Sequence, residues 1–265
     1  MAYNAGTTER NIKMVIAYDG TNYHGFQRQK NAISIQEVLE DIMSPIFGHT
    51  VKIIGSGRTD TGVHAHGQTI NFTTTARIPI EKMPIAVNSR LPRDIAVLSA
   101  EEVEAEFHAR FSAEEKTYAY QLLISDCPDP FAASYVWQVT KPLKLEAMRQ
   151  ALAVIVGTHD FSSFEASGSA VRDPVRTIYE ATLTEEGNHR VTIRFRGNGF
   201  LYHMVRNLVG SLVDVGLGRT SVEDFSAILE ARDRRKAGVT APPQGLFLEN
   251  VRYPTKILQK DENTP

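Results

Sequence analysis

The sequence predicts an α+β protein in which two ferredoxin-like βαββαβ units join into one continuous, mainly antiparallel sheet with helices packed behind it. The chain has 265 residues, 42% hydrophobic and 23% charged, which is ordinary for a globular chain of one to two domains. Strand-like and helix-like segments follow the order βαββαβ in each half, with one additional helix in the second half. This repeated order is the basis of the fold prediction.

In the first half, β-branched apolar residues predict a strand over residues 11–18, followed by a loop rich in Gly and Asn. Ser34, with Glu37 three residues later, has the spacing of a capping box and opens a predicted helix that ends near Phe47. The remaining expected elements are strands over 51–57, 68–74 and 94–103, and a helix over 80–90 that Pro84 weakens.

The second half repeats this order. Strands are expected over 116–124, 176–184, 190–198 and 245–253, and helices over 143–156, 201–215 and 221–231. We therefore expect an N-terminal subdomain over 11–108, which carries a glycine-rich loop, and a C-terminal subdomain over 109–254. The polar ends, 1–10 and 257–265, are expected to be flexible.

Composition excludes several classes of protein. The single cysteine, Cys127, rules out an internal disulfide framework and a cysteine-rich zinc site, and fits a reducing cytoplasm. No apolar run approaches the roughly 18 residues that span a bilayer, and no secretory leader is expected. The formal net charge is -2, so any affinity for nucleic acid must come from local basic faces. Two candidates are the alternating residues Arg190, Thr192, Arg194 and Arg196, and the cluster over 232–236.

The most unusual stretch is GSGRTDTGVHAHG, residues 55–67, which leaves one predicted strand and enters the next. It lacks the Lys and Ser/Thr of a phosphate-binding loop, and Asp60 occupies a position where a dinucleotide motif requires glycine. His64 and His66 could form a metal pair on one face of a strand, but no further ligands cluster nearby in the sequence. From this stretch alone, a glycine-rich hairpin with an ion pair between Arg58 and Asp60 remains equally good.

A wider set of motifs resembles the tRNA pseudouridine synthase A family. The segment GRTDTGVHAHGQ resembles the family's catalytic motif, and YDGTNYHGFQ over 18–27 resembles its first loop. The matches continue in order along almost the whole chain, with SIQ at 34–36, FHARFSA at 107–113, KTYAY at 116–120, GTHDFSSF at 157–164, GFLYHMVRN at 199–207 and GLFL at 245–248. The resemblance implies the pseudouridine synthase fold, which agrees with the two-unit sheet.

The resemblance also implies an activity. Enzymes of this family isomerise uridine to pseudouridine at positions 38, 39 and 40 in the anticodon stem-loop of tRNA, without a cofactor or metal. By resemblance, Asp60 is the nucleophile, which attacks either the ribose or the base. The resemblance implies a homodimer, so tRNA and a second copy of the chain are the expected partners, and the expected location is the cytoplasm, which the single cysteine fits.

Four further residues receive roles in substrate binding from the resemblance. Arg206 is the family's partner for the nucleophilic carboxylate, and the apolar helix around it favours a buried, paired arginine. Tyr118 stacks on the target base, which Leu248 covers from the other side, and Arg58 holds phosphate or fills the space of the flipped base. Without the motifs, Tyr118 and Leu248 would be assigned to the hydrophobic core.

Two other classes of function remain as alternatives. Ferredoxin-like units also occur in RNA-recognition modules, so a non-catalytic RNA-binding protein fits the topology. The chain lacks a clear aromatic RNP1 stretch but has the loop with Asp60, which favours the enzyme. A metal-dependent hydrolase using His64 and His66 is the third class, and it requires a bound metal.

Overall fold

A computed structural model of the chain describes residues 9–168 and 173–255. The described residues form two compact units: the first runs to Glu114 and includes the residues from Asn250 on, and the second is Glu115–Glu249. Residues 1–8 and 257–265 of the expected flexible ends lie outside the described residues. Arg10 begins the first strand, where its Nε is 2.8 Å from a carboxylate oxygen of Glu102.

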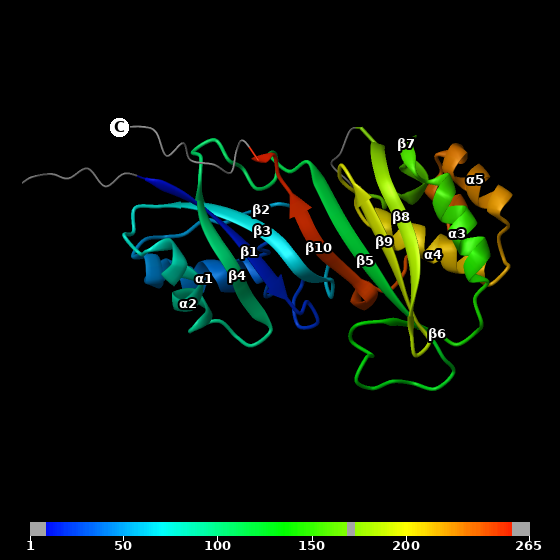
Figure 1. The fold of residues 1–265 in the computed structure, drawn as a ribbon, viewed down its shortest axis with the longest axis horizontal. Coiled ribbons are helices and arrows are strands. Elements are labelled where there is room, and N and C mark those ends of the chain that lie inside the picture. Colours follow the sequence, from blue (N-terminus) through cyan, green and yellow to red (C-terminus); the bar gives the residue numbers. More distant parts are fainter. Residues whose placement is uncertain (1–8, 169–172, 256–265) are drawn as a thin grey trace, which may run out of the picture. The chain divides into compact units, whose positions relative to one another are not determined.

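The first unit has the order βαββαβ (Figure 1). Its strands are antiparallel neighbours in the order β4-β1-β3-β2. The elements are β1 (Arg10–Tyr18), α1 (Ile35–Phe47), β2 (Ile54–Gly55), β3 (His64–Thr74), a 3-10 turn (Ile80–Lys82), α2 (Met83–Asn88) and β4 (Ile95–Val103).

The second unit repeats the same strand order with additions (Figure 1). Its order is β10-β5-β9-β8-β7, antiparallel along β5, β9, β8 and β7, with the short β6 parallel to β5. The elements are β5 (Glu115–Ile124), β6 (Trp137–Val139), α3 (Leu145–Val154), β7 (Gly157–Asp160), β8 (Val175–Gly187), β9 (Arg190–Gly197), α4 (Met204–Gly216), α5 (Val222–Ala231) and β10 (Leu246–Arg252), whose residues from Asn250 on belong to the first unit. The predicted fold class is confirmed: the protein is α+β, with a large, mainly antiparallel sheet and helices.

Helix α1 shows how the sequence sets these elements. Ser34 caps it by accepting a hydrogen bond from the backbone N–H of Glu37 at 3.3 Å, and the helix ends before Gly48 in a left-handed conformation. Its buried apolar residues recur at helical spacing, and Phe47 packs edge-on against Phe72 of β3 at 5.0 Å between ring centroids. The Glu37 carboxylate lies 3.5 Å from Arg28, so it faces the preceding loop.

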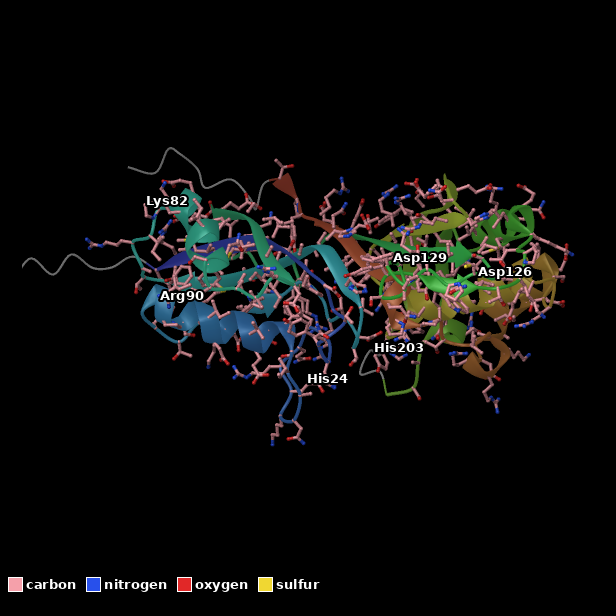
Figure 2. All side chains as sticks on the ribbon, turned by 90° about the horizontal axis from the view of Figure 1, so that it is seen from below. His24, Lys82, Arg90, Asp126, Asp129 and His203 are labelled. Atoms are coloured by element: carbon pink, nitrogen blue, oxygen red, sulfur yellow. The ribbon has the colours of Figure 1, made fainter. Side chains whose placement is uncertain are left out.

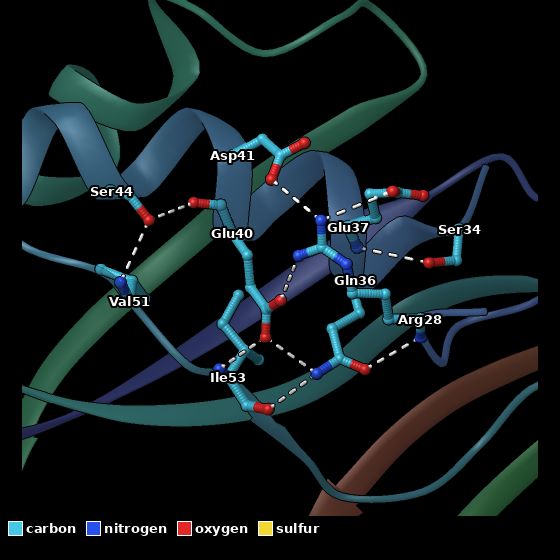
Figure 3. A network of polar contacts seen from close by, with 9 residues as sticks. All are labelled: Arg28, Ser34, Gln36, Glu37, Glu40, Asp41, Ser44, Val51 and Ile53. Atoms are coloured by element: carbon cyan, nitrogen blue, oxygen red, sulfur yellow. Dashed lines mark hydrogen bonds and ion pairs between the residues drawn. The ribbon is translucent and has the colours of Figure 1, made fainter. Parts of the chain in front are cut away.

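The strand expected over 51–57 is reduced to Ile54–Gly55. The reason is that side chains of α1 accept hydrogen bonds from the backbone just before this strand (Figure 3). Val51 N–H donates to Ser44 Oγ at 3.0 Å, and Ile53 N–H donates to Glu40 Oε1 at 3.0 Å. Because helix side chains satisfy these donors, residues 51–53 take no strand partner there.

Other boundaries also shift for local reasons. The helix expected over 80–90 is a 3-10 turn followed by α2, with Pro84 in the first turn, where proline is tolerated. The helix expected from residue 201 begins at Met204, because His203 has a φ of 59° and cannot continue a right-handed helix. Strand β3 begins at His64 rather than at Gln68, so it extends directly from the glycine-rich loop.

An apolar cluster in the first unit includes Tyr253, the residue that follows β10. Tyr253 is 6% exposed and packs with Val103, Phe107 and Ala109. Its hydroxyl donates to the carbonyl of Ala109 at 2.7 Å, and the Lys13 ammonium lies 5.1 Å from the centre of its ring. The first unit is therefore completed by residues that follow the second unit in sequence.

Candidate active site

Arg58 and Asp60 lie in the loop that joins β2 to β3 in the first unit. Arg58 is exposed, Thr59 is buried and Asp60 is half-buried. The backbone N–H of Val63 donates to the carbonyl of Asp60 at 3.1 Å and closes a turn after the carboxylate. The loop thus keeps Asp60 next to a fixed backbone rather than on a freely moving tip.

The loop before α1 is hydrogen-bonded to the backbone of this turn. The N–H of Phe26 donates to the carbonyl of Thr59 at 3.1 Å, and the N–H of Gly62 donates to the carbonyl of Tyr23 at 3.3 Å. The two sequence motifs, residues 18–27 and 55–67, are therefore hydrogen-bonded to one another within one unit. These bonds fall on both sides of Asp60.

Gly25 makes the close approach possible. It has a φ of +83°, and a Cβ at this position would lie 2.5 Å from the carbonyl oxygen of Thr59. Only glycine combines that backbone conformation with the space available. The motif over 18–27 therefore needs glycine at position 25 because the backbone of the motif over 55–67 packs against it.

Gln68 of β3 supports the start of the loop. This side chain is fully buried, and its Nε2 donates to the carbonyl of Gly57 at 2.9 Å. The hydroxyl of Ser56 donates to its Oε1, and the N–H of Ser56 donates to the carbonyl of Thr69 at 2.8 Å. The backbone before Arg58 is fixed by these contacts.

His64 and His66 do not share one environment, contrary to the expectation for alternate residues of a strand. His64 is 1% exposed, with Nδ1 3.0 Å from the N of Gly20 and 3.1 Å from Oδ1 of Asp19, while His66 is exposed. The pairing register between β1 and β3 shifts at this point, which breaks the regular alternation. Within residues 9–168 and 173–255, no three His, Cys, Asp or Glu side chains gather in a way that could hold a metal ion.

Tyr118, Arg206 and Leu248 belong to the second unit. Tyr118, on β5, is 9% exposed, and its ring packs edge-on against Phe200, with 5.2 Å between centroids and 86° between planes. Leu248, on β10, is fully buried. Both side chains therefore pack as core residues within this unit.

Arg206 connects α4 to the segment before β10. It is half-buried, and its Nε donates to the carbonyl of Ala241 at 2.8 Å, while the N–H of Ala241 donates to the carbonyl of Arg206 at 3.1 Å. Next to it, the hydroxyl of Tyr120 donates to the carbonyl of Pro242 at 2.7 Å. Burial raises the pKa of Tyr120 against the opposing charge of Arg206, so this hydroxyl stays protonated.

The arginine stripe on β9 is paired with carboxylates. Arg190 lies 3.3 Å from Asp129, which is labelled in Figure 2, and Arg194 lies 3.6 Å from Glu186. Arg196 lies 3.1 Å from Glu115 and 3.3 Å from Glu180. The stripe is therefore not a bare cationic face, and a phosphate must compete with these carboxylates for it.

The cluster over 232–236 is similarly occupied. Arg232 lies 3.3 Å from Asp160, and Arg235 lies 2.8 Å from Asp233. Arg234 has a structural role, since it donates to Oδ1 of Asn207 at 3.0 Å and to the carbonyl of Gly238 at 2.9 Å. These contacts fix the segment that follows α5.

Sequence reasoning missed three residues that shape these sites. Tyr18 and Gln68 contact the loop of Asp60, and Phe200 packs against Tyr118. Gln68 did not stand out by its type, because β3 reads HAHGQTINFTT and has several other polar residues; the available signal was its place as the last letter of the matched segment GRTDTGVHAHGQ. Tyr18 is the last residue of β1 and the first letter of the motif over 18–27, and that motif was its available signal.

Comparison with known proteins decides the family. The model of the family described as tRNA pseudouridine synthase matches residues 14–112 and 151–254, which include both loops, most of the first unit and the later part of the second unit. The chain belongs to the tRNA pseudouridine synthase family. The resemblance drawn from the motifs is thereby confirmed.

Relatives in this family match along nearly their whole length. The chain is 48% identical over 244 residues to the tRNA pseudouridine synthase A of a Thermoanaerobacter species, which covers 92% of this chain and 100% of that protein. It is 50% identical to the enzyme of the same name from an Exiguobacterium species, over 92% of this chain and 98% of that protein. A solved structure of a Cbf5-Nop10-Gar1 complex aligns at 15% identity and a TM-score of 0.35, over 77% of this chain and 44% of that chain. Among the described residues, no helix has the length and apolar character needed to cross a membrane.

Proposed function

We propose that this chain isomerises uridine to pseudouridine at positions 38, 39 and 40 in the anticodon stem-loop of tRNA, with Asp60 as the nucleophile. Membership of the tRNA pseudouridine synthase family supports the reaction. The observation that supports the nucleophile is local: Asp60 is the carboxylate within residues 55–67, and hydrogen bonds hold the backbone on both sides of it.

The reaction conserves all atoms of the nucleotide. The bond between N1 of uracil and C1′ of ribose breaks, and a bond between C5 and C1′ forms, while C5 loses a proton and N1 gains one. An ionised carboxylate that forms a covalent bond with the nucleotide divides this exchange into two easier displacements. A half-buried Asp60 suits that step, because it is open enough to reach a substrate yet limited in its motion.

Four residues bind the substrate in this proposal. Tyr118 stacks on the target base and Leu248 packs against it, because flat and apolar surfaces replace the stacking that a flipped base loses. Both side chains are covered in the protein without RNA, so this contact requires that the incoming base uncovers them. Arg58 is exposed and binds phosphate or takes the place of the flipped base. Arg206 supplies the positive charge that favours an ionised carboxylate.

The proposal also covers the cofactor requirement, the oligomeric state and the location of the enzyme. The enzyme works without a cofactor or metal and as a homodimer. Its location is the cytoplasm, where a free and exposed Cys127 remains reduced. Sedimentation of the purified protein at micromolar concentration should give twice the mass of one chain. A monomer with full activity would contradict the dimer.

Asp60→Asn tests the nucleophile, since it keeps the size of the side chain and removes its charge. With tRNA labelled by tritium at C5 of uridine, tritium release should fall by at least about a thousand-fold, because the covalent step is lost. The affinity for tRNA should change little. Asp41→Asn is the control, because that carboxylate is 63% exposed on α1 of the same unit, and it should retain normal turnover. Substantial activity in Asp60→Asn would reject the assignment, and tRNA binding without turnover in the unaltered protein would favour a non-catalytic RNA-binding protein.

A further inference from the structure

A buried pair of hydroxyl groups lies next to Asp60. The hydroxyl of Tyr18 is 2.8 Å from Oγ1 of Thr59, the residue that precedes Asp60. Tyr18 is 4% exposed and Thr59 is 6% exposed, so bulk water does not replace this hydrogen bond when it breaks. The pair therefore connects strand β1 to the loop at one defined point.

Tyr18 is a rigid support for that connection. As the last residue of β1, it pairs with Ala65 of β3 on one side and with Ile95 of β4 on the other. Its ring lies 6.4 Å from the ring of Phe26, measured between centroids. Burial raises the pKa of Tyr18, an effect that hydrogen bonds with Thr59 and Gln68 only partly offset, so the hydroxyl stays protonated at physiological pH.

Thr59 is held at two separate atoms. Its side chain bonds to Tyr18, and its backbone carbonyl accepts a hydrogen bond from the N–H of Phe26 at 3.1 Å. The next backbone contact, from the N–H of Val63 to the carbonyl of Asp60, lies on the other side of the carboxylate. The direction in which the Cα–Cβ bond of Asp60 points thus depends on how Thr59 is fixed.

We infer that the Tyr18 hydroxyl is a positioning group for the reaction: by holding Thr59, it keeps the Asp60 carboxylate directed at its target. This inference rests on Asp60 acting as the nucleophile, as proposed above. It assigns no contact between Tyr18 and the substrate. The expected signature is a loss of turnover, with tRNA binding preserved.

Tyr18→Phe removes the hydroxyl and keeps the ring. Tyr253→Phe is the matched control, because it also removes a buried tyrosine hydroxyl of the first unit, one that donates to the carbonyl of Ala109. Single-turnover rates at saturating enzyme, KM for tRNA and the melting temperature should be measured for both. We expect the rate of Tyr18→Phe to fall about ten-fold or more with KM within about two-fold, and the rate of Tyr253→Phe to stay within about two-fold of normal.

Changes at Thr59 test the same bond from its other end. Thr59→Val removes the hydroxyl at nearly constant shape and should lower the rate as Tyr18→Phe does. Thr59→Ser keeps the hydroxyl and should retain most of the rate of the unaltered protein. The double variant Tyr18→Phe with Thr59→Val should be no slower than either single variant, because both changes remove one shared bond.

The outcomes separate this inference from the proposed function. A rate for Tyr18→Phe equal to that of Tyr253→Phe, or a higher KM at unchanged rate, overturns the positioning role while an inactive Asp60→Asn leaves the nucleophile in place. The positioning role is also overturned if the rate losses of the two single variants multiply in the double variant. Activity of Asp60→Asn close to normal overturns both.

Discussion

Gly25 lies against the backbone of the loop that carries Asp60, and it offers a test of how far that loop tolerates displacement. Its φ is +83°, and an added Cβ would lie 2.5 Å from the carbonyl oxygen of Thr59. Gly48 is a suitable comparison in the same unit, because its φ is +75° and no heavy atom lies within 4 Å of the added Cβ.

Gly48→Ala should therefore lower stability by about 1 kcal/mol through backbone strain alone and keep normal turnover. Gly25→Ala carries the same strain and must also displace Thr59, so stability should fall further and turnover should drop by at least about ten-fold. Urea unfolding and tritium release from labelled tRNA measure the two effects. Equal turnover in the two variants would show that the loop tolerates this displacement.

Among individual residues, the sequence indicated those proposed to carry the chemistry better than those that support them. Asp60 and Arg58 could be selected because their motif is a short, continuous run of letters. Tyr18 and Gln68 are also letters of the matched motifs, but their supporting roles could not be read from them, because those roles depend on contacts with residues 41 and 11 positions away in the chain. Only folding brings such side chains to the loop.

Helix α1 is joined to the rest of the first unit by Glu40, which is 8% exposed (Figure 3). Its carboxylate accepts hydrogen bonds from the N–H of Ile53 at 3.0 Å, from Gln36 Nε2 at 2.9 Å and from Arg28 at 3.0 Å. Glu40 thereby connects the loop before the helix with the segment after it.

Glu40→Ala should destabilise the protein by about 2–4 kcal/mol, because it leaves the N–H of Ile53 and the amide of Gln36 without this acceptor. Asp41→Ala, one residue along, removes only a contact of 3.4 Å between Arg28 and a 63% exposed carboxylate. It should cost less than about 1 kcal/mol. Urea unfolding compares the two variants, and similar losses would show that Glu40 has no special role.

The same contacts explain where element prediction from the sequence was accurate and where it was not. Helix α5 and the hairpin of β8 and β9 follow local signals, a serine cap at Ser221 and a turn with positive φ at Asn188 and His189. The strand expected over 51–57 failed because Ser44 and Glu40 bind its first residues. Propensity describes each residue with its neighbours in sequence, and these partners lie on another element.

On the scale of the whole molecule, the order βαββαβ could be read from the sequence in both halves, since it needs only the alternation of strand and helix patterns. The return of the chain to the first unit after Glu249 could not. The residues that follow Asn250 continue a strand, and nothing in their pattern indicates which unit they complete. That information lies in contacts such as the packing of Tyr253 against Phe107, with 4.9 Å between ring centroids.

Tyr253→Ala should therefore weaken one unit rather than both. Loss of this buried ring should cost about 3–5 kcal/mol, because it leaves a cavity among Val103, Phe107 and Ala109. Hydrogen exchange followed by mass spectrometry should show faster exchange in peptides from β1 and β4, and unchanged exchange in α3, α4 and α5. Uniform acceleration throughout both units would contradict this expectation.

The discontinuous first unit has a consequence for the nascent enzyme. The segment with Asp60 leaves the ribosome early, but Tyr253 follows only after all of Glu115–Glu249 has been made. At about 5–20 residues per second, the stretch from Asp60 to Tyr253 takes roughly 10–40 s to synthesise. During this time the unit that holds Asp60 lacks part of its core, so a chain that stalls before Tyr253 has an incomplete first unit. If Asp60 is the nucleophile, as proposed above, synthesis of Tyr253 sets the earliest moment at which a new molecule can begin to modify RNA.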